Sequence, residues 1–296
     1  MSVVMTLGGG GMLGTAWQAG LLHGIQESGV SLAAVDAVIG TSAGSIVGAL
    51  LRTGVHLGPE LVERLQASAA SLAASQAPAG GTHPGRDPVA VLLNAMAAVD
   101  TTDPHMSARR LGEEALLAAT IPENTYCAAF EALVGREWPV GFCCASTEVA
   151  TGRVRALNAS TGVPLFVAVA ASAAIPMVFP SVRVRGMPYF DGGVIDSLNL
   201  DLATGHDAVI AVSCFSLTGD DEGQQLQIGL DAARAALHRI RTSVPIVELI
   251  EPDAAFATLS RGGAAAMDIG LMSEAHSAGQ RWGRECAPRV HAVLAR

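Results

Sequence analysis

Five consecutive residues, Gly40-Thr41-Ser42-Ala43-Gly44, constrain the fold of this chain more than any other stretch. The apolar run at 35–39 predicts a buried strand, and residues 45–52 predict a helix that ends near Gly54. Ser42 is therefore expected at a sharp strand-to-helix turn, where glycines avoid clashes and the helix N-terminus favours negative charge. This setting suits a nucleophilic serine. The same pattern also fits a tight turn in which the serine only caps the helix.

A glycine-rich stretch at 8–14 follows an apolar run at 3–7, which predicts the first buried strand. Backbone N–H groups of consecutive glycines can point at one oxygen with no side chain in the way, so this loop suits an oxyanion hole. The order strand, loop, helix, strand makes the first two strands neighbours in a parallel sheet. We therefore expect the glycine loop and the serine turn to open onto the same edge of the sheet.

Two nucleotide-binding motifs resemble this loop in spacing. A Walker A loop requires lysine where Thr15 stands, so this motif is excluded. Gly9, Gly11 and Gly14 match the dinucleotide fingerprint G-x-G-x-x-G. The acid that supports that fingerprint should end the second strand, whereas Asp36 begins it, which weakens the dinucleotide interpretation.

Asp191 is the candidate acid. Residues 189–190 predict a short strand before it, and Gly192 and Gly193 follow it. Two glycines allow a sharp turn, so the carboxylate can reach the end of a neighbouring strand. An aspartate in such a turn also occurs for purely structural reasons.

With these three motifs in order, the chain resembles the patatin-like phospholipases, a family of bacterial-type serine lipid acyl hydrolases. The family motifs are a G-G-G-x-[R/K]-G loop, a G-x-S-x-G elbow and a D-G-[G/A] turn, which correspond here to 9–14, 40–44 and 191–193. The resemblance runs from residue 3 to about 215. One departure is Leu13, which replaces the basic residue of the family loop. We expect this loss of charge to favour neutral esters over phospholipids.

The resemblance implies a Ser–Asp dyad in which Ser42 is the nucleophile and Asp191 orients it and takes its proton. The amides of Gly9, Gly10 and Gly11 are the candidates for the oxyanion hole. The implied activity is of the phospholipase A, lysophospholipase or acylglycerol lipase type, with no metal and no cofactor. The alternative is a catalytically weak lipid-binding or scaffold protein that keeps the fold.

Four histidines follow Asp191 and would have the right chain order to complete a Ser–Asp–His triad. None has the loop setting that Asp191 has, because one precedes a predicted strand and three lie in predicted helices. We expect surface or core roles for His206, His238, His276 and His291.

The overall pattern predicts an α/β fold over residues 1–296, a single three-layer α/β/α domain with a mainly parallel central sheet. Residues 57–125 interrupt this frame with helices predicted at 59–76, 89–99 and 107–119 and with a Pro/Gly-rich loop at 77–88. A further helix is predicted at 222–241. We interpret this insertion as a helical cap over the site that contributes apolar lining, with ordinary packing as the alternative.

The composition narrows the classes of molecule that this chain can bind. Half of the residues are hydrophobic, 15% are charged, and the formal net charge is −9, which argues against nucleic acid. A lipid substrate and peripheral contact with a membrane remain compatible with this charge. The five cysteines form no C-x-x-C motif, and neither a signal peptide nor an apolar run of about 18 residues is found, so we expect a cytoplasmic protein.

Overall fold

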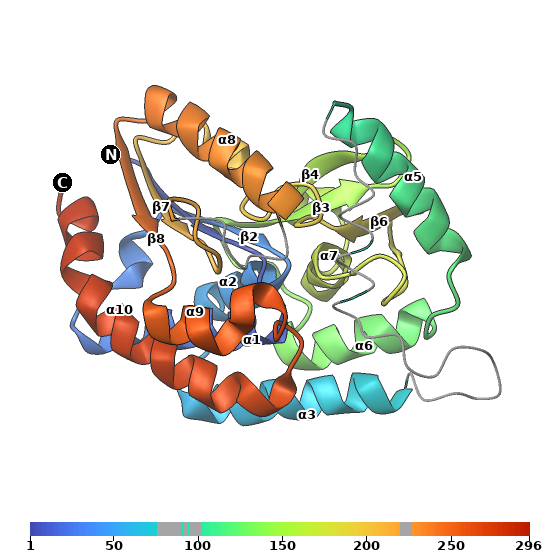
Figure 1. The fold of residues 1–296 in the computed structure, drawn as a ribbon, viewed down its shortest axis with the longest axis horizontal. Helices are drawn as coiled ribbons and strands as arrows, with labels where there is room; N and C mark the ends of the chain where they lie inside the picture. The colour runs from blue at the N-terminus through green and yellow to red at the C-terminus, as the bar shows by residue number, and fades with distance from the viewer. Residues whose placement is uncertain (76–89, 91–93, 95–101, 220–226) are drawn as a thin grey trace.

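The computed structural model describes residues 1–75, 90, 94, 102–219 and 227–296 as a mixed α/β fold (Figure 1). The strands are β1 Val3–Leu7, β2 Ala37–Thr41, β3 Phe142–Glu148, β4 Arg153–Leu157, β5 Val182–Val184, β6 Met187–Asp191, β7 Ala208–Val212 and β8 Ile246–Ile250. The α-helices described are α1 Gly11–Glu27, α2 Ala43–Arg52, α3 Pro59–Ser75, α5 Pro104–Leu117, α6 Glu123–Val134, α7 Leu165–Ser172, α8 Gln227–Ser243, α9 Ala254–Ser260 and α10 Met272–Leu294. Short 3-10 helices lie at Leu32–Ala34, Ala159–Thr161, Leu200–Ala203, Arg261–Gly263 and Ile269–Leu271.

A single sheet organises these elements, with the strand order β5-β6-β3-β2-β1-β7-β8 and with β4 paired to β3. The five strands β3, β2, β1, β7 and β8 run parallel, whereas β4, β5 and β6 pair antiparallel. Every residue of β1 and β7 is buried, as expected for parallel strands covered on both faces. Figure 1 shows α8 on one side of this sheet and α1, α9 and α10 on the other. The mainly parallel α/β fold predicted from the sequence is confirmed.

Strand β3 brings two distant parts of the chain together. On one edge, its first half pairs with β2 and its second half pairs with β6, because β4 occupies the opposite edge. Thr41, the last residue of β2, lies beside Ala145, and Asp191, the last residue of β6, lies beside Ser146. Since β2 runs parallel to β3 and β6 runs antiparallel, the C-terminal ends of β2 and β6 meet head to head.

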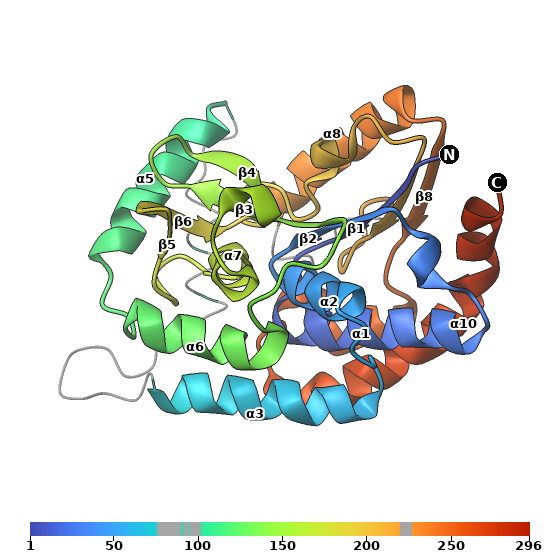
Figure 2. The same cartoon turned by 180° about the vertical axis from the view of Figure 1, so that it is seen from behind.

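Helices α1 and α10 pack at very close range because both carry glycines in their contact face. A Cβ at Gly20 or Gly24 of α1 would overlap the backbone of α10, and a Cβ at Gly279 or Gly283 of α10 would overlap that of α1. The two helices lie side by side in both cartoon views (Figure 2). The two helices lie on the same side of the sheet, and α1 begins directly at the glycine loop.

The predicted element boundaries agree with the structure to within a few residues. The first strand is found at 3–7 as predicted, whereas the serine-bearing strand extends to Thr41, two residues further than expected. Some predicted elements lie outside the described residues: the loop expected at 77–88 and nearly all of the helix expected at 89–99. The start of the helix expected at 222–241 also lies outside them. Within the described residues, no helix is both long and apolar enough to cross a lipid bilayer.

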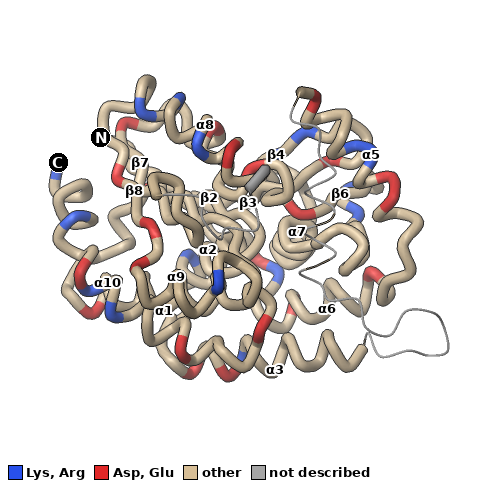
Figure 3. Tube along the Cα trace, in the orientation of Figure 1, with Lys and Arg blue, Asp and Glu red and all other residues tan. Residues whose placement is uncertain are grey.

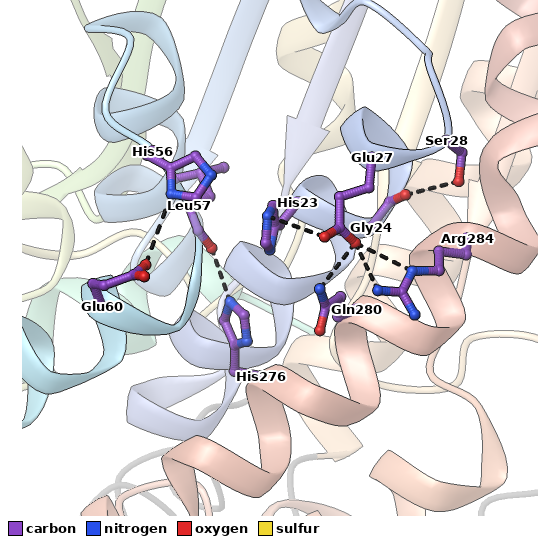
Figure 4. A network of polar contacts seen from close by, with 10 residues as sticks. All are labelled: His23, Gly24, Glu27, Ser28, His56, Leu57, Glu60, His276, Gln280 and Arg284. Carbon is purple, nitrogen blue, oxygen red and sulfur yellow. Dashed lines mark hydrogen bonds and ion pairs between the residues drawn. The ribbon is translucent and has the colours of Figure 1, made fainter.

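Three histidines meet where α1, α10 and the start of α3 pack together (Figure 4). The ring of His23 lies 4.9 Å from that of His56 and 5.9 Å from that of His276, measured between centroids. Nε2 of His276 is 2.8 Å from the carbonyl oxygen of Leu57. Burial lowers the pKa of His23 below its ordinary value; nearby Glu27 opposes this shift, and the other two histidines reinforce it.

We expect His23 to make the fold sensitive to mild acid. Its pKa is lower in the folded chain than in the unfolded chain, where it is about 6.5, so the unfolded state binds more protons below that pH. Stability should be full above about pH 6.5 and should fall as the pH drops below this value. In urea titrations between pH 7 and 5, His23→Gln should flatten this slope, whereas the exposed control His238→Gln should not. An unchanged slope in His23→Gln would contradict the assignment.

Candidate active site

Ser42 occupies the turn between β2 and α2 with a φ of 51° and a ψ of −114°. A positive φ is unfavourable for a residue with a side chain, so the surrounding structure has to impose it. A Cβ at Gly44 would overlap the carbonyl oxygen of Leu7, and one at Gly40 would overlap the backbone of Ser45. Close packing around the turn therefore explains both glycines and fixes the position of the serine hydroxyl.

The side chains of Ser42 and Asp191 are in direct contact. Ser42 Oγ donates a hydrogen bond of 2.6 Å to Oδ2 of Asp191, and the amide of Gly193 donates one of 2.7 Å to Oδ1. Asp191 is only 4% exposed. Burial raises the pKa of Asp191 to about 6, although the hydrogen bonds from Ser42 and Gly193 oppose the shift. A carboxyl group with this pKa is a stronger base than free aspartate and is still ionised at neutral pH.

Two polar side chains that sequence reasoning missed hold the backbone of the site. Oγ of Ser172 accepts the amide hydrogen of Ser42 at 3.0 Å and donates to the carbonyl oxygen of Ala145 at 2.6 Å. Nδ2 of Asn199 lies within 3.1 Å of three oxygens, including the hydroxyl of Thr41 and the carbonyl of Gly192. Both residues link the serine turn or the aspartate turn to neighbouring segments. Ser172 lies in a stretch, 171–180, that resembles the family segment preceding the aspartate, but the sequence alone does not indicate its supporting role.

The glycine loop reaches the same edge of the sheet, as predicted, but its amides are not equivalent. The amide of Gly9 donates to the carbonyl oxygen of Ser197 at 2.8 Å, so it is already occupied. This corrects the expectation that all three glycines offer free N–H groups. Within the described part of the chain, the amides of Gly10 and Gly11 have no hydrogen-bond partner, and α1 begins at Gly11. These two amides are therefore the available donors for an oxyanion.

A pocket opens at this point, bordered by the three glycines, Ser42, Asp191, Gly193 and Ser197. Its apolar wall consists of Ile175, Val194, Phe215, Ala266 and Met267. Among the described residues no arginine lines it, and Asp191 is its one acidic group. Charged residues are spread over the outer helices and over the strands and loops around the sheet (Figure 3). Leu13, the departure from the family loop, is fully buried in the core.

The cap expected from residues 57–125 contributes no described residue to this pocket. Instead, α3 packs against α6 and α10, and α5 packs against β3 and β4. The apolar wall comes in part from the segment 263–267 near the C-terminus. This segment covers the glycine loop, because the carbonyl of Ala266 accepts the amide hydrogen of Leu13 at 3.0 Å.

None of the four histidines after Asp191 lines the pocket. His276 is buried against Leu57 (Figure 4), and His206 precedes β7 at the opposite end of the strands. His238 and His291 are exposed on α8 and α10. In the described ranges, no group of three or more His, Cys, Asp or Glu side chains is arranged to bind a metal ion.

Comparison with known proteins identifies the family. The family model of the patatin-like phospholipases matches residues 5–204, which is more than half of the chain. This chain belongs to the patatin-like phospholipase family. No curated protein matches it in sequence. A solved structure, VipD from Legionella pneumophila, shares 12% identity at a TM-score of 0.43, covering 97% of this chain and 66% of that one.

The patatin-like match includes every polar residue of the site, from the glycine loop to Asn199. Phe215 and the segment 263–267 lie beyond it, although they line the same pocket. The polar part of the site thus belongs to the shared family region, and part of the apolar wall comes from elements outside the match.

The raised pKa of Asp191 predicts the pH dependence of any activity that uses it as a base. Only the ionised carboxylate can accept a proton from Ser42, so kcat/KM should rise with pH, with a midpoint at about 6. Below the midpoint, activity should fall about tenfold per pH unit. The measurement is a pH–rate profile on a p-nitrophenyl ester, with His23→Gln as the control that should leave the midpoint unchanged. A midpoint near 4, the ordinary value for aspartate, would contradict the role of burial.

Proposed function

We propose that this patatin-like protein hydrolyses acyl esters of lipids through a Ser42–Asp191 dyad. The observation that carries the proposal is the 2.6 Å hydrogen bond from Ser42 Oγ to Asp191 Oδ2 at the side of an apolar pocket. Membership of the family supports lipid acyl hydrolysis in general. The dyad and the type of substrate are inferences from the geometry.

In the acylation step, Ser42 Oγ attacks the ester carbonyl carbon while its proton passes to Asp191. The tetrahedral intermediate then collapses, the bond to the alcohol oxygen breaks, and Asp191 gives the proton to that oxygen. In the deacylation step, water attacks the acyl-serine and loses a proton to Asp191, which returns it to Ser42 Oγ as the ester bond breaks. Each half of the cycle leaves Asp191 ionised.

The negative charge of both tetrahedral intermediates develops on the former carbonyl oxygen. We propose that the amides of Gly10 and Gly11 donate to it, helped by their place at the N-terminus of α1. A single donor of this kind is typically worth about 3 kcal/mol of transition-state stabilisation. A side chain at Gly10 would overlap the sulfur of Cys214, and Gly11 has a φ of 63°, so both positions require glycine.

The apolar wall suits an acyl chain, and the alcohol part of the substrate is expected to be neutral. Among the described residues, a phosphate-bearing head group would find no arginine in the pocket lining. We therefore place acylglycerols and other neutral lipid esters ahead of phospholipids as substrates.

The dyad predicts that two single substitutions have similar effects. Ser42→Ala removes the nucleophile, and Asp191→Asn keeps the shape of the carboxyl group but removes the proton acceptor. Each should lower kcat on p-nitrophenyl esters by a factor on the order of a thousand or more, and the double variant should be no worse, because the two residues act as a unit. Circular dichroism would check that each variant remains folded.

Histidine variants and a covalent probe complete this test. Replacing His206, His238, His276 or His291 by Gln should leave activity within about tenfold. A histidine variant that is folded but as inactive as Ser42→Ala would replace the dyad by a triad. Wild-type protein should also react with a fluorophosphonate at Ser42, and a failure to react would favour the lipid-binding or scaffold alternative.

A separate prediction concerns the head group. With matched acyl chains presented in the same detergent micelles, a diacylglycerol should be hydrolysed faster than the corresponding phosphatidylglycerol, because the described residues of the pocket lining offer no cation. The ratio of kcat/KM values is the measurement. Faster hydrolysis of the anionic phospholipid would overturn the proposed preference while leaving the dyad intact.

A further inference from the structure

One side chain of the pocket has a polar group without a partner. Ser197 lines the pocket and is only 7% exposed, yet its hydroxyl makes no hydrogen bond within the described part of the chain. A buried hydroxyl without a partner costs about 1–3 kcal/mol. Such groups are rare in folded proteins, and each requires an explanation.

The backbone around Ser197 is held firmly. Its carbonyl oxygen accepts the amide hydrogen of Gly9 at 2.8 Å, and its amide donates to the carbonyl of Gly229 at 3.2 Å. Oδ1 of Asp196 accepts the amide hydrogens of the two residues that follow, Leu198 and Asn199, each at 2.9 Å. Ser197 is therefore fixed in place, and its hydroxyl is the one polar group of the residue that lacks a partner.

Ser197 lies between the two halves of the site. On one side, a Cβ placed at Gly9 would lie 3.6 Å from Cβ of Ser42 and 3.7 Å from the carbonyl oxygen of Ser197. On the other side, a Cβ placed at Gly193 would lie 3.2 Å from Oδ1 of Asp191 and 4.0 Å from Cα of Ser197. A group bound next to Ser197 would thus be close to both members of the dyad.

We propose that the Ser197 hydroxyl, which is closed to solvent, turns about its Cα–Cβ bond to face the pocket, where it binds the alcohol oxygen of the ester and then the water that replaces it. This inference rests on the proposed function, in which Asp191 exchanges a proton with that oxygen in the first half of the cycle and with the water in the second. The alcohol oxygen and the water must therefore occupy the same place beside Asp191. Ser197 donates to the alcohol oxygen as the bond to carbon breaks, and it later orients the water that attacks the acyl-serine.

The test separates the two halves of the reaction. With p-nitrophenyl butyrate the leaving group is weakly basic and needs little help, so Ser197→Ala should acylate nearly normally but deacylate slowly. We expect a burst of about one equivalent of p-nitrophenol, followed by a steady-state rate about 10- to 100-fold below wild type. Fluorophosphonate labelling of Ser42, which needs no water, should stay within about threefold.

Thermal stability distinguishes this role from a purely structural one, because a structural hydroxyl would destabilise the protein when it is removed. Removing an unpaired hydroxyl loses no hydrogen bond, so the thermal midpoint of Ser197→Ala should not fall. A matched control is Ser181→Ala, because Ser181 also has a buried hydroxyl without a partner but does not line the pocket. It should show no burst and a wild-type rate.

A second pair of variants isolates the hydroxyl from the shape of the side chain. Ser197→Thr and Ser197→Val have nearly the same size, so the threonine variant should deacylate at least fivefold faster if the hydroxyl binds water. Equal rates in this pair would overturn the proposal, as would a Ser197→Ala variant that turns over normally. Loss of labelling in parallel with turnover would assign Ser197 to the nucleophile or the oxyanion instead. Loss of all activity in Ser42→Ala tests the dyad separately.

Discussion

The site depends on one edge of β3. β2 and β6 approach this edge from opposite directions and end at neighbouring positions, so the residue after β2 and the last residue of β6 are forced together. The hydrogen bond between Ser42 and Asp191 is the consequence. Ser172 and Asn199 then secure the two strand ends, and the strained backbone of Ser42 is maintained by the packing of the elbow glycines. The proposed nucleophile and base, 149 residues apart, are thus positioned by sheet pairing.

The electrostatics of the site follow from the same arrangement. Meeting inside the sheet, the strand ends bury the carboxylate of Asp191, and this burial raises its pKa toward neutrality. In the proposed reaction, charge on the substrate oxygen develops next to the amides of Gly10 and Gly11 at the start of α1, which have no partner among the described residues. The loop that carries these amides is restrained from two directions, through Ser197 and through Ala266.

The frame of the site could be predicted because its signals are local. A buried strand, a glycine pair around Ser42 and a double glycine after Asp191 each reflect backbone requirements within about five residues. Their order along the chain was enough to predict a parallel sheet and a common edge. The predicted strand at 3–7 and the fold class are confirmed by the structure.

The remaining features depend on contacts between residues far apart in sequence, which leave no local pattern. The occupied amide of Gly9 and the supporting role of Ser172 both depend on partners more than a hundred residues away. The apolar wall is expected to come in part from an insertion at 57–125, because helices inserted into α/β folds often cover the site. Among the described residues it comes partly from 263–267, a segment whose composition resembles an ordinary small-residue turn.

The most direct test of the account is a crystal structure of the protein after reaction with a fluorophosphonate. The account predicts phosphorus bonded to Ser42 Oγ, one phosphonyl oxygen within about 3 Å of the amides of Gly10 and Gly11, and Asp191 as the nearest ionisable side chain. An adduct on another residue would contradict it. So would a phosphonyl oxygen turned away from the glycine loop, or a histidine in contact with the modified serine.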